Sequence, residues 1–151
     1  MTILAAAEQH PAWRWLRSKG WKIVPDTGVK GSGNTDLKRR LVLIRPSVYT
    51  SPNSRHSRFV LPHELWHAVH GEAYGYACPT LMAARRLDRP SAIEVAAQAC
   101  VRDGTTQMTA WIRGSIRWHN GHGYRYTWGD VRSVEAVELA RRLRAVIQGG
   151  A

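Results

Sequence analysis

The chain has 151 residues, 44% of them hydrophobic, and a formal net charge of +11 at pH 7. This size and composition predict one compact domain, residues 1–151, with a buried core. No stretch approaches the roughly 18 apolar residues that a membrane-spanning helix needs, and residues 1–10 do not have the pattern of a secretory signal. We therefore expect a cytoplasmic protein without a membrane partner.

The basic residues are mostly arginine and are spread along the chain. Such a charge attracts phosphates and acidic partners without specificity, so nucleic acid is a candidate partner. The sequence has no zinc-knuckle, homeodomain or RNA-recognition signature that predicts specific binding. The two cysteines, Cys78 and Cys100, are too few for a disulfide framework and are predicted to be buried free thiols.

The N-terminal part is predicted to contain one helix and two strands. Residues 3–19 have helical spacing, and Gly20 is placed to end this helix. Residues 21–24 alternate like a short strand, and the apolar, β-branched run 40–44 predicts a second, fully buried strand. Residues 26–34, rich in glycine, predict a loop. The expected core contacts of the helix are Leu4, Ala7, Trp15 and Leu16.

Residues 58–70 form the first strongly helical segment in the middle of the chain, and Gly71 is expected to end it. Apolar residues recur there every four positions, which predicts a core-facing stripe. Pro62 disfavours a helix interior, so we expect this helix to begin at Leu61 or to be kinked. The residues of the stripe are Leu61, Leu65 and Val69.

Further helices are predicted over residues 81–87 and 92–102. Pro90 and Ser91 open the second of these, with Ser91 as its N-cap, Glu94 as the capping-box partner and Gly104 as its stop.

The C-terminal part is expected to contain a hairpin and a helix. Residues 108–117 fit a helix or a strand, Asn120-Gly121 indicates a hairpin turn, and residues 124–128 alternate like a strand. Residues 130–147 predict a last amphipathic helix. Its expected core residues are Val134, Val137, Leu139, Leu143 and Val146.

The run His63-Glu64-Leu65-Trp66-His67 has the spacing of a metal-binding motif. On a helix, residues i and i+4 lie on one face, so both imidazoles can meet one zinc ion at about 2.0–2.1 Å. In this motif the glutamate contacts the water on the metal and acts as general base. We therefore predict zinc ligands at His63 and His67 and a catalytic Glu64.

A catalytic zinc site takes three protein ligands and leaves one position to water, so a third ligand is expected elsewhere. The extended pattern with glycine three and histidine six residues after His67 is absent, because His70 and Ala73 stand there. Glu94 lies on the next long predicted helix and is favoured, although a capping-box role would engage its carboxylate with the Ser91 backbone. The alternatives are Glu72, Asp103, His119 and His122.

Residues 58–70 resemble the core of the ImmA/IrrE-type metallopeptidases, which carry an Arg-Phe-x-Leu-x-His-Glu-Leu-Gly-His run, often with a histidine three residues further on. Glu94, Ala97 and Gln98 are similar to the second signature of that family, with glutamine in place of asparagine. The preceding order of helix, strand, loop and strand also agrees. The resemblance covers roughly residues 10–104.

The resemblance implies zinc bound by His63, His67 and Glu94, with a catalytic Glu64. It also implies an α+β, gluzincin-like fold in which a small mixed sheet packs on the HExxH helix and a Glu-bearing helix follows. The activity it implies is hydrolysis of peptide bonds in a protein substrate, such as a repressor in a phage or mobile-element setting.

Peptide hydrolysis also needs a donor that steadies the oxyanion. The candidates by chemistry are His119, His122, Tyr124 and Tyr126. Two other classes of function are open. The positive charge favours a DNA-associated protease, which single-stranded DNA should stimulate. A zinc-bound but non-catalytic structural or interaction protein, for example of a phage particle, should instead form a stable assembly without peptidase activity.

Overall fold

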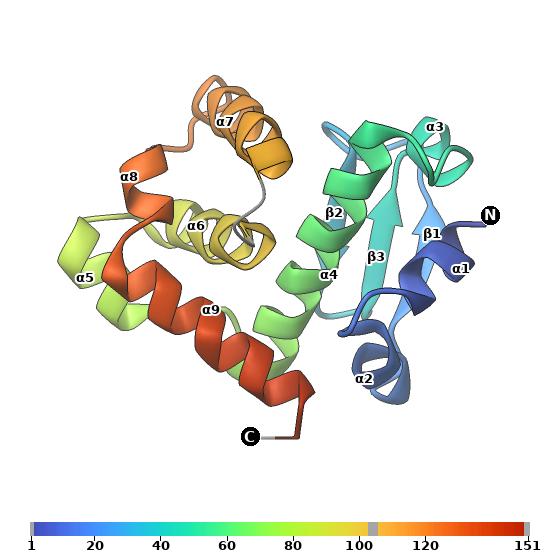
Figure 1. Ribbon diagram of the computed structural model, residues 1–151, viewed down its shortest axis with the longest axis horizontal. Coiled ribbons are helices and arrows are strands. Elements are labelled where there is room, and N and C mark those ends of the chain that lie inside the picture. The colour runs from blue at the N-terminus through green and yellow to red at the C-terminus, as the bar shows by residue number, and fades with distance from the viewer. Residues whose placement is uncertain (1, 103–105, 150–151) are drawn as a thin grey trace.

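A computed structural model describes residues 2–102 and 106–149, which form an α+β fold, as the sequence predicts. The long helix α4 (Arg55–Tyr74) runs through the middle, with a small sheet on one side and most of the later helices on the other (Figure 1). The expected helix stop Gly104 and the alternative ligand Asp103 lie outside the described residues.

The sheet consists of β1 (Lys22–Pro25), β2 (Gly33–Asp36) and β3 (Leu41–Ile44), in the order β1-β3-β2. Strand β1 is parallel to β3 and β2 is antiparallel to it, so the sheet is mixed. The short helix α3 (Pro46–Tyr49) then leads toward α4. Two strands were predicted to within a residue, but β2 begins inside the expected loop 26–34. Its polar sequence has little β-propensity, and pairing with the buried β3 makes it a strand.

The N-terminal helix is divided, contrary to the prediction of one helix over 3–19. Helix α1 (Ile3–Glu8) and helix α2 (Trp13–Ser18) are separated by a turn that contains Pro11, whose ring disfavours helical backbone in the preceding residue. Gly20 follows α2 with φ of 93°, as expected of a helix stop. Of the expected core contacts, Ala7 and Leu16 are buried and Trp15 is partly buried, whereas Leu4 is 48% exposed.

Helix α4 extends beyond the predicted segment at both ends. Its N-cap is Ser54, whose hydroxyl accepts a hydrogen bond from the Ser57 amide. Gly75, with φ of 58°, forms the C-cap. Gly71, the expected stop, therefore lies inside the helix and has another role.

Pro62 also lies inside α4, so the first of the two expectations, that the helix begins at Leu61, is wrong, and the kink stays a prediction. Proline cannot donate a backbone hydrogen bond, and the burial of the surrounding helix offsets that loss. The stripe of Leu61, Leu65 and Val69 is buried as predicted. Residues 63–71 are all buried, because the sheet and the C-terminal helices cover different sides of α4.

Helix α5 (Pro79–Arg85) lies close to the predicted helix over 81–87. Helix α6 (Arg89–Val101) begins earlier than expected, because its N-cap is Asp88, whose carboxylate accepts a hydrogen bond of 2.8 Å from the Ser91 amide. The prediction of Ser91 as N-cap is wrong. Ser91 is buried in the first turn of the helix, and its hydroxyl accepts from the amide of Arg125.

Three helices complete the chain: α7 (Thr106–Asn120), α8 (Trp128–Val131) and α9 (Val134–Ile147). The predicted helix over 130–147 is interrupted because Ser133 caps α9 with its hydroxyl.

The buried stripe of α9 differs from the expected one. Leu143 is buried, but Val134 and Val137 are 81% and 47% exposed. The other buried residues are Ala136 and Ala140, which let α9 approach α6 closely. Of the remaining expected core residues, Leu139 packs partly buried against the core and Val146 is partly exposed.

The predicted hairpin does not form in the described residues 121–128. Asn120 ends α7, and residues 124–127 form neither helix nor strand. The Asn120 side chain holds this segment instead: its amide donates to the Tyr126 carbonyl at 2.8 Å, and its oxygen accepts from the Tyr126 amide.

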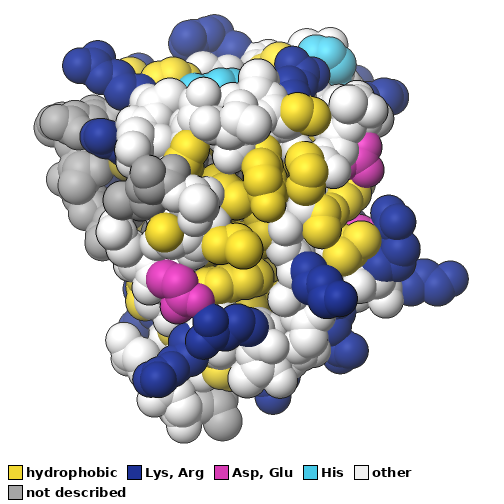
Figure 2. All heavy atoms as spheres, turned by 90° about the vertical axis from the view of Figure 1, so that its right-hand side faces the viewer, with side chains coloured by type: hydrophobic (Ala, Val, Ile, Leu, Met, Phe, Trp, Pro, Cys, Tyr) yellow, Lys and Arg dark blue, Asp and Glu magenta, His cyan; other side chains and the backbone are white. Residues whose placement is uncertain are grey.

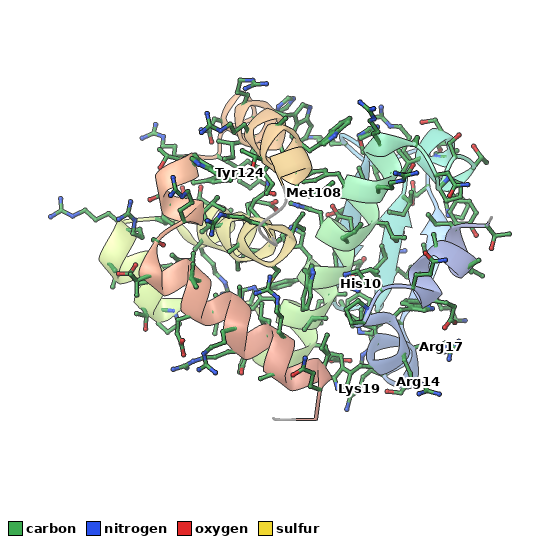
Figure 3. The ribbon with its side chains drawn as sticks, viewed as in Figure 1. His10, Arg14, Arg17, Lys19, Met108 and Tyr124 are labelled. Carbon is green, nitrogen blue, oxygen red and sulfur yellow. The ribbon has the colours of Figure 1, made fainter. Side chains whose placement is uncertain are left out.

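Cys78 and Cys100 are buried and free, as predicted. Among the described residues, no helix combines the length and the apolar character that crossing a membrane requires. Figure 2 faces the side of the molecule with α1, α3 and β1, where Lys and Arg side chains surround exposed apolar atoms. Figure 3 shows Arg14, Arg17 and Lys19 around α2, away from α7. The basic side chains on the face in Figure 2 are therefore spread over it and form no single patch.

The N-cap of α6 gives a test of the fold. Asp88→Ala should lower the free energy of unfolding by about 0.5–2 kcal/mol, because the Ser91 amide loses its acceptor. Asp88→Asn, which can still cap, should remain near wild type in the same urea titration. Equal stability of Asp88→Ala and wild type would show that Asp88 does not cap α6.

Candidate metal centre

Two histidines of α4 form the first half of the candidate site. His63 and His67 lie one helical turn apart, and their Nε2 atoms are 3.1 Å from each other. Both side chains are only 6% exposed. The i, i+4 spacing within α4 brings the two rings together, as the sequence predicts.

The carboxylate of Glu94, on α6, completes the convergence. Glu94 Oε1 lies 3.0 Å from His63 Nε2 and 3.1 Å from His67 Nε2. Because Asp88 caps α6, the carboxylate of Glu94 is free of the capping role that competed with metal binding in the sequence.

A third histidine reaches the same carboxylate from α7. His119 Nε2 lies 3.1 Å from Glu94 Oε1. Its Nδ1 atom is 2.8 Å from the backbone carbonyl of Ser115, and because a carbonyl can only accept, Nδ1 carries the proton. A metal ion bound at the cluster would therefore meet the lone pair of Nε2, which is the arrangement that a metal-ligating histidine adopts.

The donor set fits a metal ion. Bonds of about 2.0–2.1 Å at tetrahedral angles place ligand atoms about 3.3 Å apart, close to the separations of 3.0–3.1 Å found here. The ligand atoms of His63, Glu94 and His119 all lie within 4.8 Å of one another. This His-Glu-His cluster, with His67 in contact with two of its members, can hold a metal ion.

Coupled charges make the centre attractive to a cation. Burial alone lowers the pKa of His67, but Glu94, and more weakly Glu64, raise it to about 9. Burial would raise the pKa of Glu94, yet His67, His119 and His63 hold it well below its usual range. In the metal-free protein Glu94 is therefore ionised and His67 carries a proton that a metal ion can replace.

Glu64 lines the same cavity as the cluster, and its carboxylate is held by the sheet. Its carboxylate accepts a hydrogen bond of 2.8 Å from the Thr35 hydroxyl on β2. A Cβ atom on Gly33 would lie 2.9 Å from Glu64 Cγ, so β2 can pass this close only because residue 33 is glycine. Neither residue was among the predicted site residues: Gly33 falls in the expected loop 26–34, and Thr35 follows that loop without a predicted element.

Tyr76 is a further cavity residue that sequence reasoning missed. It adopts φ of 62° after α4 and lines the cavity together with Asn34, Thr35 and Ile93. A Cβ atom on Gly71 would lie 2.8 Å from Tyr76 Cζ, so the absent side chain of Gly71 makes room for the ring. Burial, assisted by Glu64, raises the pKa of Tyr76. The phenol therefore stays protonated and can donate a hydrogen bond.

Of the four predicted oxyanion donors, only His119 lines the cavity, and Tyr124, Tyr126 and His122 do not. The Tyr126 hydroxyl is 3.0 Å from His119 Nδ1, and the Tyr124 ring lies edge-on to His119 between α6 and α7 (Figure 3). His122 is exposed and stacks on Trp118.

The rival ligand Glu72 is engaged elsewhere. Its carboxylate pairs with Arg40 and accepts a hydrogen bond from the Trp21 indole. Glu72 therefore takes no part in the cluster.

Comparison with protein-family models, with curated proteins and with solved structures found no match for this chain. The class that the fold and the site define is an α+β protein with a buried His/Glu cluster able to hold a metal ion.

The raised pKa of His67 predicts a pH-dependent metal affinity. Below about pH 9 a proton must leave His67 before its nitrogen can bind, so zinc affinity should fall as pH decreases from 8 to 6. Calorimetry at pH 7 in buffers of different ionisation enthalpy should show about one proton released per ion. His122→Ala, outside the cluster, should behave like wild type. Affinity that does not change with pH would contradict the ligand role of His67.

Proposed function

We propose that the protein is a zinc-dependent peptidase whose catalytic group is Glu64. One observation carries the proposal: a carboxylate held by Thr35 faces the same cavity as a His/Glu cluster with the separations of a zinc site. Imidazole nitrogens with one carboxylate are a donor set that suits zinc. The resemblance of residues 58–70 to the ImmA/IrrE-type metallopeptidases supports the same activity.

Three ligands are proposed, His63, His67 and Glu94, because these are mutually closest. These residues would hold a zinc ion, which would supply the Lewis acidity that makes water nucleophilic near neutral pH and polarises a carbonyl. Glu64 accepts a proton from the attacking water, whose oxygen bonds to the peptide carbon. Glu64 then delivers that proton to the nitrogen as the C–N bond breaks, which yields a carboxylic acid and an amine.

Tyr76 is the residue best placed to donate a hydrogen bond to the oxyanion. Its phenol is protonated and lines the cavity. His119, with its proton on Nδ1, can donate from Nε2 only after it gains a second proton. His119 is therefore better suited to accept a hydrogen bond from water or to bind the metal.

Within the described part of the chain, the unpaired edge of strand β2 is an argument for a polypeptide as the substrate. The Arg45 amide donates to the Ser32 carbonyl, and the alternation of an antiparallel pair then turns the backbone groups of Gly33 and Thr35 away from β3. These two residues line the cavities beside Glu64. An extended polypeptide can add to this edge as a further strand. A cytoplasmic repressor of a phage or mobile element is the substrate that the family resemblance favours.

The contact of His119 with Glu94 keeps a second function open. If His119 is a fourth ligand, the zinc site is closed, which is typical of a structural rather than a catalytic site. The protein is then a zinc-bound structural or interaction protein. A DNA-associated protease has less support, because the basic side chains on the face in Figure 2 form no single patch, and stimulation by single-stranded DNA is its test.

Glu64→Gln separates catalysis from metal binding. The amide cannot take up the proton, so kcat/KM for an unstructured protein or a candidate repressor should fall by about 10²–10⁴-fold. Zinc content, measured by elemental analysis, should stay at about one equivalent. His67→Ala, the matched control, should lose both the activity and the metal. Cleavage by Glu64→Gln at the wild-type rate would exclude Glu64 as the base.

His119→Ala distinguishes the open site from the closed one. Because His119 is not one of the three proposed ligands, His119→Ala should keep about one equivalent of zinc through gel filtration in dilute chelator. Glu94→Ala removes a proposed ligand and should lose the zinc. Loss of zinc from both variants, combined with no peptidase activity in wild type, would establish the structural alternative.

A further inference from the structure

A cleft of about 480 Å³ adjoins the metal centre and shares His63, Glu64 and His119 with it. Its other walls come from the residues before β2, from the beginning of α4 and from one face of α7. A group bound in this cleft therefore lies directly beside the proposed base.

One wall of the cleft is apolar and aromatic. Phe59 and Trp111 stack with ring centroids 6.3 Å apart, and His56 stacks on Trp111 at 5.7 Å. Phe59 also lies 5.4 Å from the ring of His63, and Val60 continues the surface toward Glu64. A large apolar side chain that leaves water for this wall gains roughly 25 cal/mol for each Å² it buries.

The rim of the cleft is basic. Lys30 and Arg117 line it and are exposed, and neither has an ion-pair partner among the residues that the structure describes. The guanidinium of Arg117 lies over Gly114, with Nη2 3.8 Å from the position of a Cβ atom there. Glu64 is the one carboxylate among the lining residues, and Thr35 already donates to it. A carboxylate on the substrate is therefore favoured at this rim.

We propose that this cleft selects a bulky apolar side chain next to the cleaved bond and an acidic residue close to it in the substrate. The inference rests on the proposed peptidase function and names its substrate class: an extended polypeptide segment with that pair of residues.

Nucleic acid fits the cleft less well. Bases bind to aromatic rings that offer a free face. The Trp118 ring has His122 stacked on it at 4.1 Å and lies 3.1 Å from the position of a Cβ atom on Gly31. Trp111 has Phe59 and His56 as stacked neighbours.

Binding to the zinc-loaded Glu64→Gln variant tests the cleft without cleavage. Calorimetry should compare short unstructured peptides that contain Phe and Glu, Ala and Glu, or Phe and Lys at the two positions. The Phe and Glu peptide should bind about tenfold or more tightly than the Ala peptide, and about fivefold more tightly than the Lys peptide. Equal affinities for all three would overturn the proposal, as would binding of an oligonucleotide in their place.

Variants of the cleft have matched controls on nearby elements. Trp111→Ala in this background should remove most of the preference for Phe, whereas Trp128→Ala should not, because Trp128 does not line the cleft. Arg117→Glu should reverse the preference between Glu and Lys. Arg113→Glu, the same charge change on α7 beside Trp128, should leave the preference unchanged. Arg117 is exposed, so its variant keeps the test valid if Trp111→Ala does not fold.

The two proposals fail in different ways. If the peptides bind with the expected preference but wild-type protein with zinc does not cleave them, the cleft is supported and the peptidase function is wrong. If wild type cleaves an unstructured protein, mass spectrometry of the products locates the cuts. Cuts that show no enrichment of bulky apolar and acidic residues leave the peptidase function standing and overturn the specificity.

Discussion

The convergence of the Glu94 carboxylate with the imidazoles of His63 and His67 is the interaction on which the rest of the structure depends. A buried carboxylate is costly unless positive charge or a metal compensates it, so α4 and α6 must be held in a fixed register. Small residues make this approach feasible, since α6 buries several alanines near α4 and α9. The burial of α4 on several sides follows from the same requirement.

Two glycines, which have no side chain, make room for the residues that line the cavity. Gly33 lets β2 pass beside Glu64, and Gly71 leaves space for the ring of Tyr76. With Thr35 as hydrogen-bond donor, the sheet thus positions Glu64 independently of the cluster. Glu64 shares α4 with His63 and His67, but its carboxylate is held by Thr35 of β2, so a change of Glu64 to glutamine can leave the ligand cluster in place.

Charge has separate roles at the site and on the surface. Within the centre, anionic Glu94 raises the pKa of His67 and favours a cation. On the face in Figure 2 the basic residues are dispersed, and at the cleft Lys30 and Arg117 offer charge to a ligand. A positive net charge is therefore compatible with an acidic polypeptide as partner and does not by itself indicate nucleic acid.

The sequence alone determined what depends on local spacing. The positions of His63 and His67 one turn apart follow from helical periodicity, and the buried strand over 40–44 follows from its apolar run. Only the tertiary structure decided which residues from distant parts of the chain come close to these two histidines. His119 and Tyr76 enter the cavity because α7 and the turn after α4 pack there, and no periodicity in the sequence records that packing. Likewise, the polar strand β2 exists because β3 offers it hydrogen bonds, an interaction between segments rather than a property of either one.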